Sequence, residues 1–508
     1  MSFVTVASDA VETAAEDLSG VVSTIESAST RAAPATTMVL PPAADSVSTR
    51  LAALFNEHGQ VYQSVSTQAV TLYEEFVDTL SVSGGSYAES EEANVLALQP
   101  PLGRAPLSAT RVSGRGLTSI STLLAEDEVT ALIMGGTMNP LPDAGYVRQI
   151  NNAFIQTGFP GAVPRGVFTP EQFWPVTPHL GNLTFNRSVA EGVRLLDTAV
   201  DTELSSGNPA VVFGYSQSAT IAHNYINSLV AVGSPYPDDI SFMMVGSPNN
   251  PVGGLLSRFP GFHIPFLDVP FNGATSANIP YQTSIYTAQY DGIAHAPQFP
   301  LNVLSDINAV MGYFSVHMDY PNLLADQVAN AVPLPTSPGY TGNTNYYMFL
   351  TQDLPLLQPI RAIPYIGPPI ADLLQPQLRV LVDLGYADFG PGGNYADIPT
   401  PAGLLAIPDP FAVTYYLIKG GLQAAYGAAV DIGVQAGLIG PEWFPTSYPW
   451  VPSINPGLHF YWGQSQVTLL SVLSGLLGQM LYWIPPYVFE WFGFDPVWWT
   501  GVQTGQAA

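Results

Sequence analysis

A short stretch in the middle of the chain restricts the fold more than any other part of the sequence. The apolar run Pro209-Ala210-Val211-Val212-Phe213 leads into Gly214-Tyr215-Ser216-Gln217-Ser218 and then into a segment rich in Ala, Ile and Leu. This order predicts a buried strand, a sharp turn and a helix, with Ser216 in a strained backbone conformation at the turn. The Ser216 hydroxyl would stand exposed at the sheet edge, and the N–H of Gln217 would point at an oxygen that gains negative charge. The stretch therefore predicts a serine nucleophile; the alternative is an ordinary turn between strand and helix.

Composition excludes several classes of function. The 508 residues are enough for two or three domains, and the absence of cysteine excludes disulfides, thiolate catalysis and Cys-ligated zinc. A formal charge of -26 argues against a nucleic-acid partner. Only 10% of the residues are charged, while 47 prolines and 46 glycines punctuate an apolar sequence, which is typical of an envelope or surface protein rather than of an acidic disordered tail. The amino terminus lacks the basic and apolar regions of a cleavable signal peptide.

The first part of the chain has the pattern of a helical hairpin. Apolar residues recur every three or four positions from residue 4 to about 29 and again from 45 to about 80, and Pro34, Pro41 and Pro42 mark a break between them. The apolar stripes are too long for the two helices to cover each other alone, so a helical partner would complete a bundle. The alternative is docking of the hairpin on the rest of the chain.

Several short motifs in this hairpin resemble the mycobacterial PE domain. They are Met1-Ser2-Phe3-Val4, Ala33-Pro34-Ala35-Thr36-Thr37 and Leu54-Phe55-Asn56-Glu57-His58-Gly59, while Ser8-Asp9 stand where the naming Pro-Glu pair is expected. The resemblance covers residues 1–93. Tyr87 and Glu91 match the Tyr-x-x-x-Asp/Glu export signal of type VII secretion substrates. The resemblance thus implies a PPE-type helical partner, and export by the type VII machinery, without a cleaved signal, to the cell envelope or beyond.

A Gln-, Pro-, Gly- and Ser-containing linker at 94–118 precedes the domain expected to carry the chemistry, at 119–350. Strands are predicted at 129–134, before Gly214, at 241–245 and at 284–289, and a crossover helix at 188–201, opened by a Ser188–Glu191 capping box. Strands that alternate with helices predict an α/β fold, with a parallel sheet and a site at its carboxyl edge. The turn after the first strand would supply a second oxyanion donor, Gly136 or Thr137; the alternative is a plain tight turn.

A serine nucleophile needs a base, and we predict that His317 serves. Serine hydrolases built on such a sheet carry nucleophile, acid and base in that chain order. Asp291 follows the strand predicted at 284–289, so we expect it to orient His317. This chemistry calls for no metal and no cofactor. The alternatives are His295 and His263 for the base, and Asp268, Asp306 and Asp319 for the acid.

Motifs around these residues resemble the PE-PPE domain, a cutinase-like serine α/β-hydrolase domain of the same bacteria. They are Gly214-Tyr215-Ser216-Gln217-Ser218, Tyr290-Asp291-Gly292-Ile293-Ala294, the run from Pro300 to Ala309, and His317-Met318-Asp319-Tyr320. The family triad falls on Ser216, Asp291 and His317. The resemblance implies an esterase or lipase that acts on acyl esters of lipids, or an acyltransferase that moves acyl chains between trehalose-type glycolipids. The rival hypothesis is a non-catalytic surface or adaptor protein.

The remaining residues, 351–508, are rich in Pro and aromatic side chains. Residues 407–438 and 467–484 form long apolar segments, the second near the lower length limit for crossing a bilayer. We expect this region to form an apolar cap or a membrane-facing segment, which would permit peripheral association with the envelope. The alternatives are a spanning helix and a buried helix pair.

Overall fold

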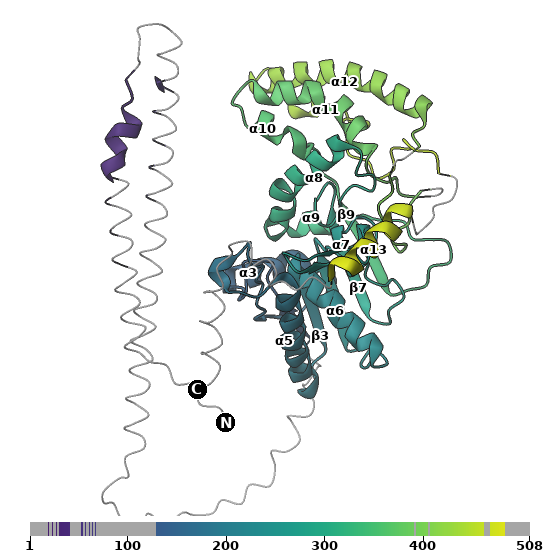
Figure 1. The fold of residues 1–508 in the computed structure, drawn as a ribbon. Helices are drawn as coiled ribbons and strands as arrows, with labels where there is room; N and C mark the ends of the chain where they lie inside the picture. The colour runs from purple at the N-terminus through teal and green to yellow at the C-terminus, as the bar shows by residue number, and fades with distance from the viewer. Residues whose placement is uncertain are drawn as a thin grey trace, which may run out of the picture. The chain divides into compact units, whose positions relative to one another are not determined.

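The computed structural model (Figure 1) describes residues 30–40, 129–390, 393–404, 407–461 and 468–482, together with residues 19, 23, 27, 52, 53, 56, 60, 63 and 67. The chain divides into two compact units, Met1–Leu117 and Thr118–Ala508. The predicted linker at 94–118 and the predicted export signal at Tyr87 and Glu91 lie outside the described residues.

The described residues of the first unit are helical in both segments that carry the apolar repeat. The prediction that Pro34 breaks the first helix is wrong, because residues 30–37 form a helix that includes it. Proline removes one backbone hydrogen bond from a helix. In the same turn the hydroxyls of Thr36 and Thr37 donate to the carbonyls of Ala32 and Ala33 at 2.9 and 2.7 Å.

A seven-stranded sheet forms the centre of the second unit, in the order β2-β1-β3-β4-β7-β9-β8. The strands are β1 (Thr130–Ile133), β2 (Val163–Gly166), β3 (Ala210–Tyr215), β4 (Ile240–Val245), β7 (Gln282–Ala288), β8 (Val332–Pro333) and β9 (Thr344–Phe349). Neighbours are parallel except β8 and β9. The four predicted strands are present within two residues of their expected limits. Strands β2, β8 and β9 were not predicted.

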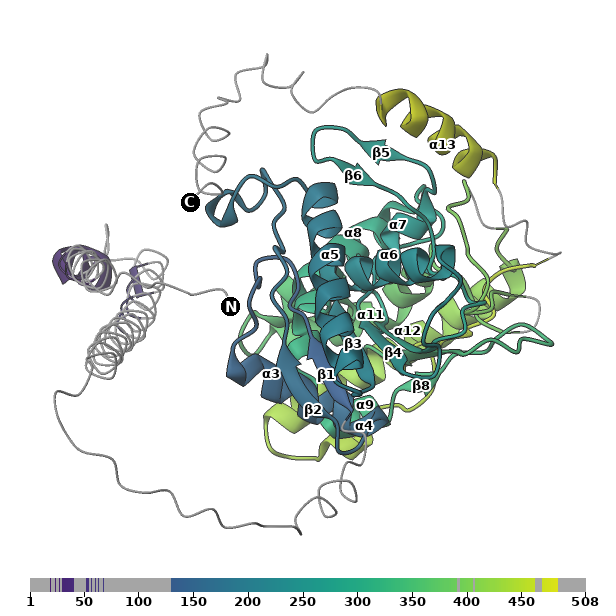
Figure 2. The same ribbon diagram turned by 90° about the horizontal axis from the view of Figure 1, so that it is seen from below.

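Helices cover both faces of this sheet (Figures 1 and 2). Alternate residues of β3 enter opposite cores, because successive side chains of a strand point to opposite faces. Val212 packs in the core that includes residues of α5 (Phe185–Ser205) and α6 (Gln217–Ala231). Phe213 packs in the other core, against η1 (Asn151–Ile155), which continues α3 (Ala144–Ile150). The result is a three-layer α/β unit, as the alternating pattern predicted.

The crossover helix α5 begins earlier than predicted, and the proposed capping box is wrong. Its N-cap is Thr184, so Ser188 lies inside the first turns. The Ser188 hydroxyl is fully buried and accepts hydrogen bonds from the backbone N–H of Gln172 and from Nε2 of Gln217. This residue therefore connects the helix to the turn after β3 instead of starting the helix.

The other helices are α4 (Gln156–Gly158), α7 (Leu255–Arg258), α8 (Val303–Ser315), α9 (Ala325–Ala329), α10 (Gln358–Arg361), α11 (Gly367–Asp383), α12 (Pro410–Gln435) and α13 (Leu469–Tyr482), with short 3-10 helices that include η3 (His317–Asn322). Strands β5 (His263–Ile264) and β6 (Val269–Pro270) form a separate hairpin. Helix α11 packs against α12 and α8, and α13 packs against the hairpin (Figure 2).

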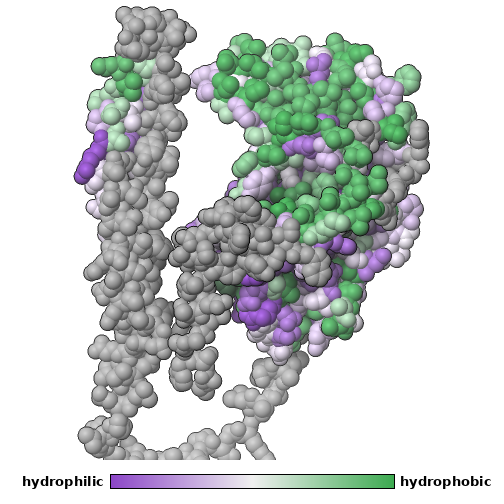
Figure 3. Space-filling view, in the orientation of Figure 1, coloured by the Kyte–Doolittle hydropathy of each residue, from purple (hydrophilic) through white to green (hydrophobic). Residues whose placement is uncertain are grey.

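The two apolar segments of the carboxyl-terminal region become α12 and α13. Each helix packs one side against other elements of the second unit and exposes apolar side chains on another. In α12, Phe411 and Leu422 are 83% and 73% exposed, and in α13 Met480 is 72% exposed. Figure 3 shows apolar side chains gathered over α10, α11 and α12. Among the described residues, no helix combines the length and the apolar character that a membrane crossing requires.

Candidate active site

Ser216 lies in a sharp turn between β3 and α6 and has φ 56° and ψ -115°. A positive φ is uncommon for a residue with a side chain, so the backbone is strained as the sequence predicted. Ser218 secures the turn, because its hydroxyl accepts a hydrogen bond from the N–H of Tyr215 at 2.8 Å. At Gly214, a Cβ atom would lie 2.6 Å from the carbonyl oxygen of Ser218, so glycine is required where strand and helix approach each other.

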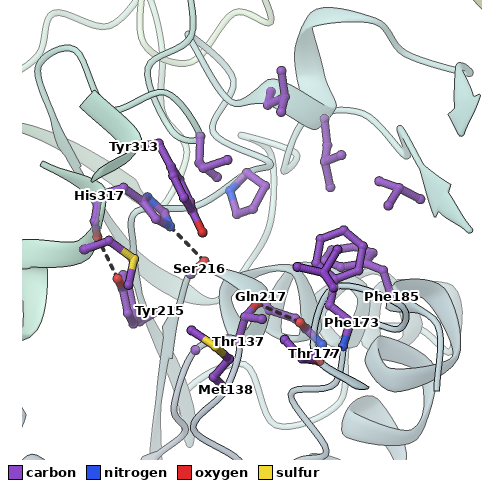
Figure 4. Close-up of a pocket in the computed structure, with 18 of the residues that line it drawn as sticks. Thr137, Met138, Phe173, Thr177, Phe185, Tyr215, Ser216, Gln217, Tyr313 and His317 are labelled. Atoms are coloured by element: carbon purple, nitrogen blue, oxygen red, sulfur yellow. Dashed lines mark hydrogen bonds between the residues drawn. The ribbon is translucent and has the colours of Figure 1, made fainter. Parts of the chain in front are cut away.

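The three residues predicted as nucleophile, base and acid lie together at the carboxyl edge of the sheet. Nε2 of His317 is 2.9 Å from Oγ of Ser216 (Figure 4), and Nδ1 of His317 is 2.9 Å from both carboxylate oxygens of Asp291. Asp291 follows β7, and His317 begins η3 directly after α8. Asp291 and His317 are 0% and 1% exposed. The arrangement can pass a proton from Ser216 to His317 and stabilise the resulting imidazolium.

The buried Asp291 carboxylate is fully hydrogen-bonded. Burial would raise its pKa, but the His317 imidazole and hydrogen bonds from the N–H of Ile293 and the hydroxyl of Tyr320 hold that pKa below its usual value. The Tyr320 hydroxyl also accepts from the N–H of Ala288, at the end of β7. Sequence reasoning missed Tyr320. The available signal was its position three residues after His317, which is one turn of a 3-10 helix.

His317 is held from its backbone as well as from its ring. The hydroxyl of Tyr215, the residue before Ser216, donates to the carbonyl oxygen of His317 at 2.6 Å. At Gly246, which has φ 58°, a Cβ atom would lie 2.8 Å from the Tyr320 ring and 3.3 Å from Cε1 of His317. Only glycine therefore leaves room for the histidine and tyrosine at this edge.

The predicted oxyanion residues lie beside Ser216. Thr137, Gln217 and Gly136 line the same cavity as Ser216, and the hydroxyl of Thr137 donates to Oε1 of Gln217 at 2.9 Å (Figure 4). The backbone N–H groups of Thr137 and Gln217 have no acceptor within residues 129–390. The sheet order reverses at β1 and β3, and ligands of open α/β sheets bind at such switch points. At Gly136, a Cβ atom would lie 3.0 Å from the Tyr215 ring, so the loop passes close to the turn.

The structure places the alternative bases elsewhere. Nδ1 of His295 accepts from the N–H of Tyr290, its ring stacks on Tyr386, and burial lowers its pKa to about 3. His263 lies on β5, and its Nε2 is 3.6 Å from Asp268.

The alternative acids also bind other groups. Asp268 accepts from the hydroxyl of Thr184, and Asp319 from the side chain of Asn322. Asp306 lies in the first turn of α8. Among the described residues, no cluster of three His, Asp or Glu side chains is arranged to hold a metal ion.

A cavity of about 520 Å³ opens beside Ser216. Beyond the Thr137 and Gln217 side its wall is apolar, with Phe173 and Phe185 labelled in Figure 4. The other apolar residues of this wall come from α7, the β5–β6 hairpin and the loops beside them: Leu255, Leu256, Ile264, Leu267, Val269, Phe271 and Ile293. The volume lies in the range of small-molecule sites, and the lining suits a hydrocarbon chain.

Comparisons with known proteins identify the two parts of the chain. Residues 4–94 match the PE family, and residues 160–387 match the PE-PPE domain. The chain is 49% identical over 489 residues to PE family protein PE3 of Mycobacterium tuberculosis (strain ATCC 25618 / H37Rv), covering 96% of this chain and 100% of that relative. It is 41% identical over 417 residues to Esterase PE16 of the same strain, covering 81% and 74%. Uncharacterized PPE family protein PPE28, also of that strain, is 39% identical over 343 residues, covering 67% and 52%. The chain therefore belongs to the PE family and carries a PE-PPE domain after its PE domain.

Proposed function

We propose that the protein is a serine esterase that cleaves esters of apolar acyl chains. The observation that carries this proposal is the hydrogen-bonded chain from Asp291 through His317 to Ser216, located at one wall of an apolar cavity. A relative that covers most of the chain is named an esterase, which supports the same reaction class.

The geometry supports a two-step acyl transfer. With Nδ1–H of His317 donated to Asp291, Nε2 accepts the Ser216 proton as Oγ attacks the ester carbonyl. The N–H groups of Gln217 and of Gly136 or Thr137 would bind the oxyanion. His317 then returns the proton to the departing alcohol, which leaves an acyl group on Ser216. Water, activated by His317, releases the acid and restores the serine.

The acyl part of the substrate is proposed from the cavity and its rim. Met138, Val176, Tyr313 and Met318 line the cavity and are 37% to 59% exposed at its mouth, so an apolar path leads from the surface to Ser216. An acyl chain loses contact with water along such a path, which favours binding by about 0.8 kcal/mol for each buried CH₂ group.

The decisive experiment compares labelling by a fluorophosphonate probe with hydrolysis of p-nitrophenyl esters. Ser216→Ala and His317→Ala should lose turnover by a factor on the order of 10^5, because the triad acts as a unit. Asp291→Asn should lose about 10^4. Asp319→Asn is the matched control, because it changes an acid two residues from His317 that binds Asn322 instead. A wild-type protein that neither labels nor turns over would refute the proposal and favour a non-catalytic surface or adaptor role.

Transfer of the acyl group to a sugar hydroxyl is the alternative fate of the same acyl-enzyme. The chemistry up to that point is identical, so only the products separate the two reactions. Mass spectrometry of products formed from an acyl ester with a trehalose glycolipid present should show free acid for an esterase, or a newly acylated glycolipid for an acyltransferase.

The PE match at residues 4–94 supports two further proposals, that the hairpin pairs with a PPE-type helical protein and that the type VII machinery exports the chain to the envelope. Coexpression of the protein with PPE-type proteins, followed by size-exclusion chromatography, tests the first. Tyr87→Ala should abolish export if the second holds.

A further inference from the structure

A segment between β2 and α5 holds the predicted oxyanion loop at two points. The N–H of Thr169 donates to the carbonyl of Pro140 at 3.0 Å, and the carbonyl of Glu171 accepts from the N–H of Met138 at 3.1 Å. Thr137 lies next to Met138, so these two bonds set the backbone position of a predicted donor.

The next residue of the segment holds the other predicted donor. The carbonyl of Gln172 accepts from Nε2 of Gln217 at 3.1 Å, and the N–H of Gln172 donates to the Ser188 hydroxyl at 2.9 Å. Since Gln217 in turn binds Thr137, residues 169–172 connect both predicted oxyanion donors in one network.

Glu171 is an unusual residue at the centre of this segment. It is 0% exposed and has φ 46°, a conformation that is costly for a residue with a side chain. Its Oε1 accepts from the Thr169 hydroxyl at 2.8 Å, while the buried Oε2 has no hydrogen-bond partner among the described residues. A carboxylate would be poorly stabilised there, whereas a neutral carboxylic acid loses far less on burial.

We propose that Glu171 is a positioning residue for the oxyanion loop and that it serves as an uncharged carboxylic acid. This inference rests on the proposed esterase function. A negative charge buried beside the loop would oppose the negative charge that develops on the substrate oxygen, because electrostatic interactions are strong where water is excluded. Loss of the Glu171 proton should therefore slow the chemical step.

The surroundings of Glu171 keep the proton on it. Burial raises its pKa to about 8, and the hydrogen bond from Thr169 partly opposes that rise. The groups that its carboxyl faces are the Thr169 hydroxyl and Tyr146 of α3, while its backbone carbonyl binds the loop after β1. Only Tyr146 among these ionises, and burial, with a contribution from Glu171, raises the pKa of its phenol above 10.0, so it stays neutral while Glu171 titrates.

The test is the pH dependence of kcat for the full chain, measured with a p-nitrophenyl ester from about pH 6 to about pH 10, with Ser216→Ala as the blank. Wild-type kcat should fall about tenfold per pH unit above the pKa of Glu171 if the ionised form is inactive. Glu171→Gln, which is neutral at every pH, should keep kcat near pH 7 within about threefold and lose this fall. The Michaelis constant should change little, because the effect is on the transition state.

Two further variants keep the inference testable if Glu171→Gln does not fold. Thr169→Val removes the hydrogen bond that lowers the pKa of Glu171, so the alkaline fall should move to higher pH. Glu203→Gln is the matched control, because Glu203 binds Arg165 and Thr130 at the start of β1, so the fall should stay unchanged. Circular dichroism across the same range checks that the fold persists.

The outcomes separate this inference from the proposed function. A wild-type protein that shows no turnover refutes the esterase proposal itself. An active wild type whose kcat does not fall at alkaline pH overturns the role of Glu171. An alkaline fall of kcat in Glu171→Gln with the same midpoint as in wild type would also overturn that role. So would a fall in Thr169→Val whose midpoint does not move.

Discussion

One tyrosine hydroxyl connects the proposed acid of the triad to the end of a strand. Tyr320 donates to Asp291 at 2.8 Å and accepts from the N–H of Ala288 at 2.6 Å, so it fixes the acid relative to the end of β7. Tyr320→Phe leaves a buried carboxylate with one donor fewer. Hydrogen bonds to charged groups contribute about 1.5–3 kcal/mol, so we expect kcat to fall by about tenfold or more.

The measurement is kcat for an acyl ester at saturating concentration. Tyr347→Phe is the matched control, because Tyr347 lies on β9 and stacks on Tyr286 at 4.7 Å. Equal activity of Tyr320→Phe and wild type would show that Asp291 is held well enough by Ile293 and His317.

Glu171 also makes stability depend on pH. Its pKa is about 8 in the folded chain against an ordinary value of 4.5. Between these values the folded chain binds one proton more than the unfolded chain. The contribution of Glu171 to the free energy of unfolding is therefore complete below its ordinary pKa. It is lost as the pH rises from there through the pKa of the folded chain, at about 1.4 kcal/mol per pH unit.

Urea unfolding of wild type and Glu171→Gln in a series of buffers measures this effect. The difference between their free energies of unfolding should decrease with that slope across the interval and level off above it. A difference that does not change with pH would mean that Glu171 is already ionised in the folded protein.

Helix α11 supports the loop that carries the proposed acid. The hydroxyl of Tyr290, which has φ 68° and precedes Asp291, donates to Oδ1 of Asp383 at 2.6 Å. Arg379 contacts the same hydroxyl at 3.1 Å. The hydroxyl of Tyr448 donates to Oδ2 of Asp383 at 2.8 Å. The carboxyl-terminal region therefore supports the loop that carries Asp291 through Tyr290.

The two tyrosines form a matched pair for a mutational test. Tyr290→Phe and Tyr448→Phe each remove one hydrogen bond to Asp383, and Tyr290→Phe also removes the one from Arg379. Each should lower the free energy of unfolding by about 1–3 kcal/mol. Only Tyr290 adjoins Asp291, so only Tyr290→Phe should lower kcat. A comparable loss of kcat in both variants would indicate that they act through stability alone.

The second unit extends beyond the catalytic motifs to the carboxyl-terminal helices. Tyr290 shares a buried cluster with Leu354, Leu357, Ala371 and Val382, which lie after β9. A chain that ends at residue 350 would lack these partners, expose Tyr290 to water and lose the α11 contacts with the acid loop. Removal of residues 1–117 leaves the second unit whole.

We therefore expect opposite results from two truncations. The chain that starts at residue 118 should hydrolyse esters within about twofold of the full chain, because the triad and its supports lie in one unit. The chain that ends at residue 350 should be inactive and aggregate, because buried apolar surface becomes exposed. Activity and light scattering of both purified chains measure this, and an active short chain would show that α11 is dispensable.

The sequence by itself determined the features that depend on neighbours along the chain. Alternation of apolar strands and helices predicted the parallel sheet, and the small residues around Ser216 predicted the strained turn. Chain order predicted that Asp291 and His317 would join Ser216, because the carboxyl ends of parallel strands meet at one edge.

Only the tertiary structure decided which distant groups support that edge. Tyr320 binds Asp291, which lies 29 residues away in the chain. Glu171, in the segment after β2, binds the loop that follows β1. Ser188 looked like a helix cap because its local pattern fits one, yet burial against Gln172 and Gln217 gives it another partner. Hydrogen bonds of this kind form between segments that packing brings together, and local sequence patterns do not record which segments those are.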